Sequence, residues 1–269
     1  MGLSLLNNIT SLEADNQLNQ TSASLQNVLV QLSSGSRLNS GADDPAGLSI
    51  ADSLQANETM LAQAANNANN GIGLLQTADG SLGQVTNLLD RAVTIATEAA
   101  NGGLSTSQLQ ALDNEYQSIQ AEINRIGTYT TFNNTNIFTG STTSIFLGSA
   151  QDSIGVTIGT LSTTSLGLQG TDLTSNPDAA TALQAINVAV SVVAQDRGTI
   201  GATLNRLTDA QNVINNQVTN ITSAENLITS ANIPADVTQE AQLSVLEQTG
   251  MSALTQANQS TQFILKLFQ

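Results

Sequence analysis

Residues 183–228 read LQAINVAVSVVAQDRGTIGATLNRLTDAQNVINNQVTNITSAENLI and place mostly apolar side chains at alternating spacings of three and four residues. That spacing keeps one face of an α-helix apolar over many turns, which is typical of a coiled-coil seam. A single phase persists along the whole stretch, so we expect one long helix. Its seam consists of Leu183, Ile186, Val190, Val193, Arg197, Ile200, Leu204, Leu207, Gln211, Ile214, Val218, Ile221, Glu225 and Ile228.

Two further seams of the same kind run from Leu54 to Ala100 and from Leu109 to Ile126. A few polar residues interrupt the apolar pattern. Such residues can set the register between two helices, or they can simply face solvent where the seam leaves its partner. Both interpretations stay open for Glu58, Asp79, Gln211 and Glu225.

Residues that favour caps and turns mark the expected helix ends. Asp43-Asp44-Pro45 offers an N-cap and a proline for the first helical position before the second seam. Asn101-Gly102-Gly103 predicts the end of that helix, and Ser105 or Ser107 can cap the next one. We expect that third helix to end at Gly127.

The period changes between Thr142 and Thr160, where the chain is rich in Thr, Ile, Val and Phe and is punctuated by glycine. This pattern predicts a short β-hairpin or two. Asn176-Pro177-Asp178 then predicts the start of the long helix. The expected fold class is mainly α: a long antiparallel helical rod or coiled coil with a small β-hairpin insert, whose chain doubles back so that its ends meet.

The two terminal segments are helical in pattern but poor in apolar bulk. Ser33-Ser34-Gly35-Ser36 predicts the end of the first, and both are rich in Asn, Gln, Ser and Thr. Such segments bury too little apolar surface to offset the entropy of ordering. We expect both ends to be disordered in the monomer and helical in an assembly. The alternative is an ordinary two-helix hairpin within one chain.

Composition excludes several classes of function. The chain has no Cys and no His, which removes thiol nucleophiles, Cys/His zinc sites and Ser–His triads. Carboxylate pairs such as Asp43 and Asp44 are better explained as helix caps, so we expect no enzyme, cofactor or metal. A formal net charge of −15 with six basic residues argues against nucleic acid.

The segment from Met1 to Thr10 carries no Lys or Arg before its apolar residues, so it lacks the basic region of a secretory signal. No uninterrupted apolar stretch is long enough to span a bilayer, and we expect no membrane insertion. If the protein is exported, it uses a route that leaves its N-terminus uncut.

Several blocks of sequence, in order and at both ends of the chain, resemble bacterial flagellins. They cover about residues 1–140 and 176–269. The blocks are LSSGSRLNS at 32–40, DDPAG at 43–47, NNANNGI at 66–72, QTADG at 76–80, SIQAEINRI at 118–126 with Phe132-Asn133, and QANQS at 256–260 with Ile264-Leu265.

The resemblance implies a structural subunit that polymerises into the extracellular flagellar filament for swimming motility. It implies export in an unfolded state by the flagellar type III system, with identical subunits, an export chaperone and filament cap proteins as partners. Residues 1–40 and 230–269 would form an inner tube, and 41–140 and 176–229 a helical rod layer. The short insert at 141–175 stands where many flagellins carry large outer domains, so the chain resembles a minimal flagellin.

Three sets of site residues accompany this resemblance. A vertebrate innate immune receptor that reads flagellins of the enteric type would contact Arg91, Ile95 and Glu122. The alternative is a solvated arginine and an isoleucine buried beside the seam. The hydroxyl cluster of Ser141, Thr142, Thr143 and Ser144 suits either O-linked sugars or local hydrogen bonding in a turn. The apolar stripes of the terminal helices would form the subunit interface through Leu5, Ile9, Leu12, Leu25, Leu32, Leu243, Leu246, Ala253, Ala257, Ile264 and Leu267.

Two alternatives remain at this point. A hook–filament junction protein shares the terminal pattern, and a secreted coiled-coil adhesin would share the seams without self-polymerisation.

Overall fold

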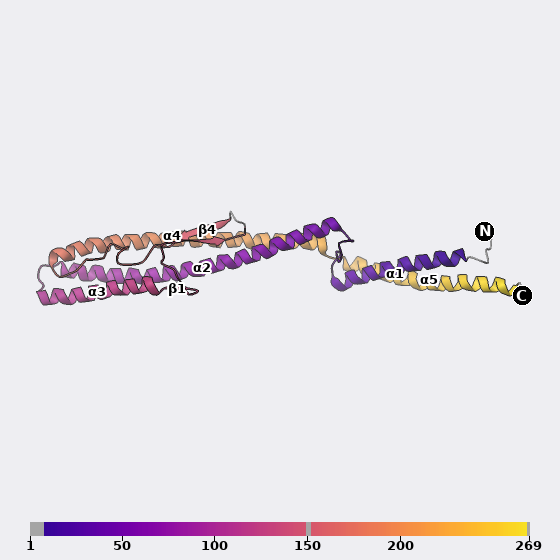
Figure 1. Cartoon of the computed structure of the whole chain (residues 1–269), viewed down its shortest axis with the longest axis horizontal. Coiled ribbons are helices and arrows are strands. Elements are labelled where there is room, and N and C mark those ends of the chain that lie inside the picture. The colour runs from indigo at the N-terminus through magenta and orange to yellow at the C-terminus, as the bar shows by residue number, and fades with distance from the viewer. Residues whose placement is uncertain (1–7, 149–151, 268–269) are drawn as a thin grey trace. The chain divides into compact units, whose positions relative to one another are not determined.

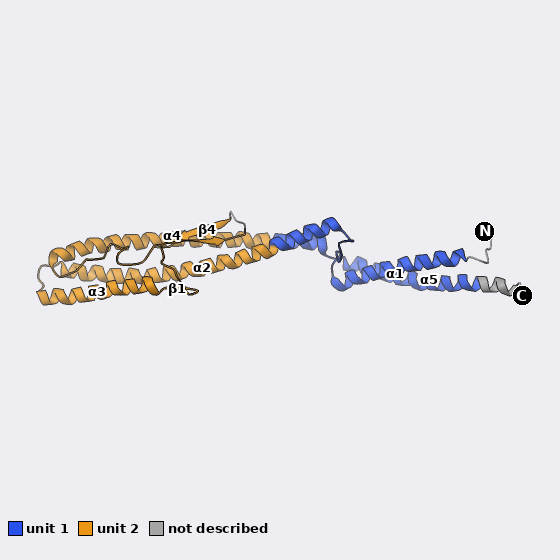
Figure 2. Ribbon diagram, viewed as in Figure 1, with its two compact units in different colours: residues 1–57, 220–269 blue, residues 58–219 orange. Residues whose placement is uncertain are grey.

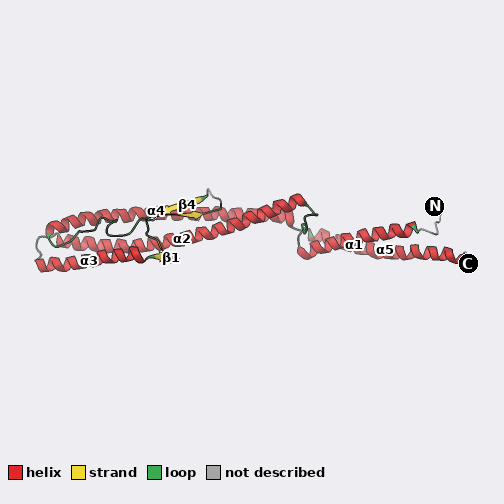
Figure 3. Cartoon of the chain, viewed as in Figure 1, coloured by secondary structure: helices red, strands yellow, loops and turns green. Residues whose placement is uncertain are grey.

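The computed structural model of the chain describes residues 8–148 and 152–267, with side chains up to residue 260. Helices dominate this part of the chain, and the strands form two short antiparallel pairs (Figures 1 and 3). The predicted mainly α fold with a small β-hairpin is confirmed. The elements are α1 (Ile9–Ser34), α2 (Pro45–Ala99), α3 (Thr106–Tyr129), β1 (Thr131–Phe132), β2 (Thr135–Asn136), β3 (Thr142–Phe146), β4 (Ser153–Thr157), α4 (Asn176–Thr229) and α5 (Ile233–Leu267).

The chain divides into two compact units (Figure 2). Unit 1 comprises Met1–Asn57 and Asn220–Gln269, and it contains α1 and α5. Unit 2 comprises Glu58–Thr219, and it contains α3 and both strand pairs. The boundary between the units falls within the residue ranges of α2 and α4.

Most helix ends lie where the capping residues predict them. Gly35 follows α1 with φ of 68°, a left-handed conformation that glycine adopts without strain. The Asp44 Oδ1 atom accepts the Gly47 N–H at 2.9 Å and caps α2. At the start of α3, the Gln108 side chain accepts the Ser105 N–H at 2.8 Å, as in a capping box.

The predicted end of α3 at Gly127 is wrong, because the helix continues to Tyr129. Gly127 is buried, and a Cβ atom there would lie 1.8 Å from the Leu161 carbonyl oxygen. This glycine therefore permits the close approach of a neighbouring segment rather than the end of a helix.

In unit 2, α2 and α4 run antiparallel through the predicted seams. Asn69 accepts a hydrogen bond from Gln211 at 2.8 Å, and Asp79 lies opposite Arg197, so residue numbers fall along α4 as they rise along α2. Each seam alternates buried with half-buried positions. The buried members include Leu61, Ala68, Leu75, Leu82, Leu89 and Ala96 of α2 and Ile186, Val193, Ile200, Leu207 and Ile214 of α4.

The segment after β4, residues 158–175, packs along α3 without forming strand. Its leucines at 161, 166, 168 and 173 are buried. Polar side chains of α3 fix its backbone. The Asp113 Oδ1 atom accepts the Leu173 N–H at 2.9 Å, and the Asn124 Oδ1 atom accepts the Thr163 N–H at 2.9 Å. The predicted insert is therefore part hairpin and part turn-rich cover for α3.

Two hairpins are present in the described residues. In the larger, β3 pairs with β4 from Thr142↔Thr157 to Phe146↔Ser153. Ile145 of β3 lies against α2 at Gly71, where a Cβ atom would come within 2.4 Å of its Cδ1 atom. The smaller hairpin, β1–β2, turns at Asn133 and Asn134 with positive φ, and it lies outside the predicted insert.

By length and composition alone, α4 is long and apolar enough to cross a membrane, with a mean hydropathy of 1.2 in its best window. This single helix is weak evidence for a span, because helices of ordinary protein cores pass the same test. Here the seam of α4 includes Arg197 and Gln211, which hydrogen-bond to α2.

Candidate assembly interface

Within unit 1, α1 and α5 pack side by side (Figure 1). The positions of α1 that are half-buried or buried recur at spacings of three and four, as do the half-buried positions of α5. This is the spacing of a coiled-coil seam. The inner seam consists of Ser11, Ala14, Leu18, Thr21, Leu25, Val28 and Leu32 of α1 and Asp236, Glu240, Leu243, Glu247, Gly250, Leu254 and Ala257 of α5.

Small and polar side chains dominate this seam. Gly250 lets α5 approach α1, because a Cβ atom there would lie 3.3 Å from the Leu18 Cδ1 atom. Ser22 of α1 donates a hydrogen bond to the Glu247 carboxylate at 3.0 Å. Of α1, Thr21 and Val28 are the side chains that become buried. The pair thus buries little apolar surface for its length.

The outer faces of the two helices carry large apolar side chains in solvent. Leu12 keeps 62% of its surface exposed and Leu246 keeps 55%. Fully burying such a side chain stabilises a protein by about 1.5–3 kcal/mol. Covering these faces would therefore stabilise an assembly, whereas a single chain leaves them in water. Their exposed members are Ile9, Leu12, Leu29 and Val30 of α1 and Ile233, Val237, Val245, Leu246 and Met251 of α5.

The structure places the predicted interface residues in two groups. Ile9, Leu12, Leu246 and Ala253 are exposed, whereas Leu25, Leu32, Leu243 and Ala257 are half-buried in the seam between α1 and α5. The predicted stripe of α5 therefore does not form a single face. Glu247 and Leu254 occupy the inner seam beside Leu243 and Ala257. Leu5 lies outside the described residues, as do the side chains of Ile264 and Leu267.

The sequence predicts disordered ends in the monomer, whereas the structure shows α1 and α5 as helices paired within one chain. This pairing is the arrangement of the two-helix alternative. The hydroxyl and carboxamide groups of the terminal residues, such as the Asn8 Nδ2 atom that donates to the Ala257 carbonyl at 3.1 Å, contribute to it. How well the pair persists without neighbours stays a prediction.

The three residues predicted for receptor contact do not form one accessible surface. Ile95 is 1% exposed in the core of unit 2, so the prediction is wrong for this side chain. Arg91 is exposed, but its Nε atom donates to Glu115 at 2.7 Å, which raises the Arg91 pKa. Glu122 is bound by Arg125 at 2.6 Å, and this contact lowers the Glu122 pKa. The sequence carries a signal for this burial, because Ile95 is the residue next to Ala96 in the predicted seam.

The residues predicted to carry sugars are exposed. Ser141 precedes β3, and Thr142, Thr143 and Ser144 lie on it. Thr142 shares a hydrogen bond of 2.6 Å with Thr157 across the hairpin. The other three hydroxyl side chains face solvent in unit 2.

Among the described residues, no group of three or more Asp or Glu side chains is arranged to hold a metal ion. The polar side chains that the structure buries serve packing: the Tyr116 hydroxyl group lies 2.6 Å from the Thr171 hydroxyl group, and burial raises the Tyr116 pKa. Long helices with exposed apolar faces at the paired termini are typical of structural proteins that self-associate.

Comparison with known proteins assigns the particular family. The bacterial flagellin N-terminal helical region matches residues 5–143, and the flagellin C-terminal helical region matches residues 183–268. The chain belongs to the bacterial flagellin family, and it is a structural subunit of the flagellar filament.

Relatives cover nearly the whole chain. A flagellin of Halalkalibacterium halodurans is 30% identical over 91% of this chain and 92% of its own length. A flagellin of Listeria monocytogenes is 28% identical over 97% of both chains. The crystal structure of Bacillus cereus flagellin, 30% identical, covers 60% of this chain and 94% of its own, with a TM-score of 0.50. These matches do not favour a hook–filament junction protein or an adhesin.

Proposed function

We propose that the outer faces of α1 and α5 carry the contacts between subunits in the filament. The observation that carries this proposal is the exposure of Ile9, Leu12 and Leu246 on helices whose own pairing buries few apolar side chains. A neighbouring subunit that covers these faces removes apolar surface from water, which favours association. In this arrangement the α1–α5 pair contributes one side of a larger interface.

The same reasoning assigns roles along the chain. Residues 1–40 and 230–269 form the inner tube of the filament, and 41–140 with 176–229 form the surrounding helical layer. The insert at 141–175 is short and polar outside, so it covers the helices instead of forming an additional outer domain. Large exposed apolar side chains on α1 and α5 support the first assignment, and the buried seams of α2 and α4 support the second.

Membership of the flagellin family supports a proposed place of action outside the cell. The subunit acts outside the cell after export in an unfolded state by the flagellar type III system, and an export chaperone and filament cap proteins assist it. Export of an unfolded chain requires that the folded units be easy to open. The scarcity of buried apolar side chains in the α1–α5 pair suits that requirement.

Exposed hydroxyl groups at Ser141, Thr142, Thr143 and Ser144 make the start of β3 the proposed site of O-linked glycosylation. An intact mass equal to that of the unmodified sequence would exclude this modification. A contact with a vertebrate innate receptor is not proposed through Ile95, because the folded chain buries it.

Substitution of Leu12 tests the assembly interface. Leu12→Gln keeps the size and exposure of the side chain in the monomer but removes its apolar surface, whereas Leu12→Met is a volume-conserving apolar control. We expect Leu12→Gln to reduce the polymerised fraction measured by sedimentation and electron microscopy, and Leu12→Met to assemble like the parent chain. Normal assembly of Leu12→Gln would remove Leu12 from the interface.

A further inference from the structure

The dipeptide Asn-Gly occurs twice in the sequence, as Asn70-Gly71 and as Asn101-Gly102. The side chain of the asparagine is exposed in both places. In such a dipeptide the main-chain nitrogen of the glycine can attack the asparagine carboxamide, and the missing Cβ atom leaves this approach unhindered. The two copies therefore share their local chemistry and differ in the backbone that carries them.

The backbone around Gly71 is fixed. Gly71 lies inside α2, where each main-chain N–H donates to the carbonyl group four residues earlier. The residue is buried, and Ile145 fills the space where its Cβ atom would be, with its Cδ1 atom at 2.4 Å. Rotation of this peptide group toward the Asn70 carboxamide requires α2 to open.

The backbone around Gly102 is held by neither a helix nor a neighbouring segment. The residue lies in the exposed loop between α2 and α3, and no atom lies within 4 Å of the place of its Cβ atom. The Asn101 carbonyl group accepts the Gly103 N–H at 2.9 Å. In the part of the chain that the structure describes, neither the Gly102 N–H nor the Asn101 carboxamide makes a hydrogen bond.

We propose that Asn101 is a site of spontaneous deamidation in the folded protein and that Asn70 is protected from the same reaction. The Gly102 main-chain nitrogen attacks the Asn101 Cγ atom and loses its proton, so that a new C–N bond closes a succinimide ring. The Asn101 Nδ2 group leaves as ammonia. Water then adds to either carbonyl carbon of the ring and opens it to an aspartyl or an isoaspartyl residue. Nothing is oxidised or reduced, and water is the single co-reactant.

The product changes the electrostatics of one loop. It adds a carboxylate just beyond the last residue of α2, Ala99, in a chain whose formal net charge is already −15. A negative charge near the C-terminus of a helix is unfavourable because the helix dipole is negative there. Deamidation at Asn101 thus marks the age of a subunit with an added charge and a less stable end of α2.

Peptide mass mapping of the full chain tests this proposal. The purified protein is held at mildly alkaline pH, and the conversion of both asparagines is followed over time in buffer and in concentrated urea. We expect Asn101 to react more than about tenfold faster than Asn70 in buffer, because α2 must first open locally at Gly71. In urea, where neither backbone is held, both sites should react at similar rates.

Gly102→Ala supplies the matched variant. Its Cβ atom enters open space, so the fold is retained, but it hinders the attack on the carboxamide. We expect slower conversion at Asn101 in this variant, in buffer and in urea. Two results would overturn the proposal: an Asn101 that stays unreacted in the folded chain while it reacts in urea, or an Asn70 that keeps pace with Asn101 in buffer.

Discussion

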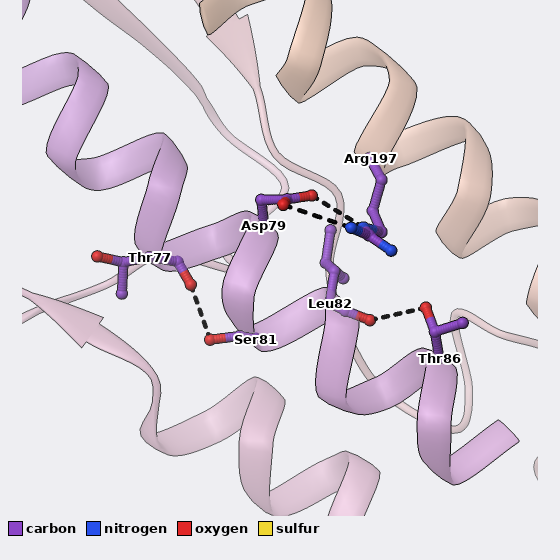
Figure 4. Close-up of polar contacts among 6 residues, drawn as sticks. All are labelled: Thr77, Asp79, Ser81, Leu82, Thr86 and Arg197. Carbon is purple, nitrogen blue, oxygen red and sulfur yellow. Dashed lines mark hydrogen bonds and ion pairs between the residues drawn. The ribbon is translucent and has the colours of Figure 1, made fainter. Parts of the chain in front are cut away.

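The Arg197 Nε atom of α4 lies 2.8 Å from the Asp79 Oδ1 atom of α2, so the polar members of two separate seams meet each other (Figure 4). Both side chains remain partly exposed, with 40% and 38% of their surface in solvent. The contact raises the Arg197 pKa, chiefly through the hydrogen bond to Asp79. The polar interruptions at these two positions thus pair with each other across the seam, as register-setting residues would, while both stay partly in solvent.

A first prediction concerns the strength of that ion pair. Exposed pairs contribute roughly 0.2–1 kcal/mol, so Arg197→Ala should lower the free energy of unfolding by less than about 1 kcal/mol. A double-mutant cycle with Asp79→Ala, measured by urea unfolding, isolates the pairwise part. The buried neighbour Ile200 gives the contrast, since Ile200→Ala should cost about 2–5 kcal/mol. An equal loss for Arg197→Ala and Ile200→Ala would contradict the assignment of stability to the apolar seam.

Gly127 provides a second prediction. Alanine in a helix interior is favoured over glycine by roughly 0.5–1 kcal/mol, and Gly83→Ala should show that gain because no atom lies within 4 Å of its Cβ position. Gly127→Ala would place its Cβ atom 1.8 Å from the Leu161 carbonyl oxygen, so it should instead destabilise the chain. Overpacking costs typically about 1–3 kcal/mol. Thermal unfolding of the two variants compares them directly, and a gain at both positions would show that residues 158–175 do not press on α3.

The buried carboxylate of Asp113 gives a third prediction. Asp113→Ala would leave the buried Leu173 N–H without an acceptor, which costs about 1–3 kcal/mol. Asp113→Asn keeps an acceptor oxygen and should retain most of the stability. The measurement is urea unfolding, with hydrogen exchange at Leu173 as a local readout. Equal stability of the alanine and asparagine variants would show that this bond does not hold the segment.

Tyr116 predicts a dependence on alkaline pH. Burial raises its pKa, because the phenolate is disfavoured away from water. An unfolded tyrosine loses its proton near its ordinary pKa of about 10, whereas folded Tyr116 keeps it. Its contribution is therefore fully present below about pH 10 and is lost as the pH rises through the raised pKa of the folded state.

Tyr116→Phe should flatten this alkaline loss of stability while costing about 0.5–1.5 kcal/mol at neutral pH through the lost contact with Thr171. Tyr129→Phe is the matched control, since the Tyr129 side chain is 72% exposed. Unfolding followed from neutral to strongly alkaline pH distinguishes them. If both variants or neither changed the pH profile, the burial of Tyr116 would not be its cause.

Much of the fold could be predicted from the sequence because it depends on local patterns. Heptad spacing gave the seams of α2, α3 and α4, and caps such as Asp44 and Ser105 gave their ends. The β1–β2 hairpin was missed although its Asn133-Asn134 turn carries a signal, since asparagine tolerates the positive φ that tight hairpins need.

The remaining differences arise from contacts between segments far apart in the sequence. Gly127 predicts a helix end from sequence alone, but its role is to admit Leu161, which lies against it in the fold. Leu246 of the predicted stripe is exposed while Glu247 lies in the inner seam, because the approach of α1 to α5 selects the inner face. Ile95 matched a family pattern, but the packing of α2 removes it from the surface. Spacing within one helix cannot determine which of two neighbouring faces a partner covers.

We propose that α1 and α5 obtain their stability from neighbouring subunits. Limited proteolysis of monomer and filament, with the surviving fragments identified by mass spectrometry, tests it most directly. We predict that the monomer loses both terminal helices and keeps the core formed by residues 58–219, and that the filament protects the termini. Terminal helices that resist the protease in the monomer as well as residues 58–219 do would contradict the account.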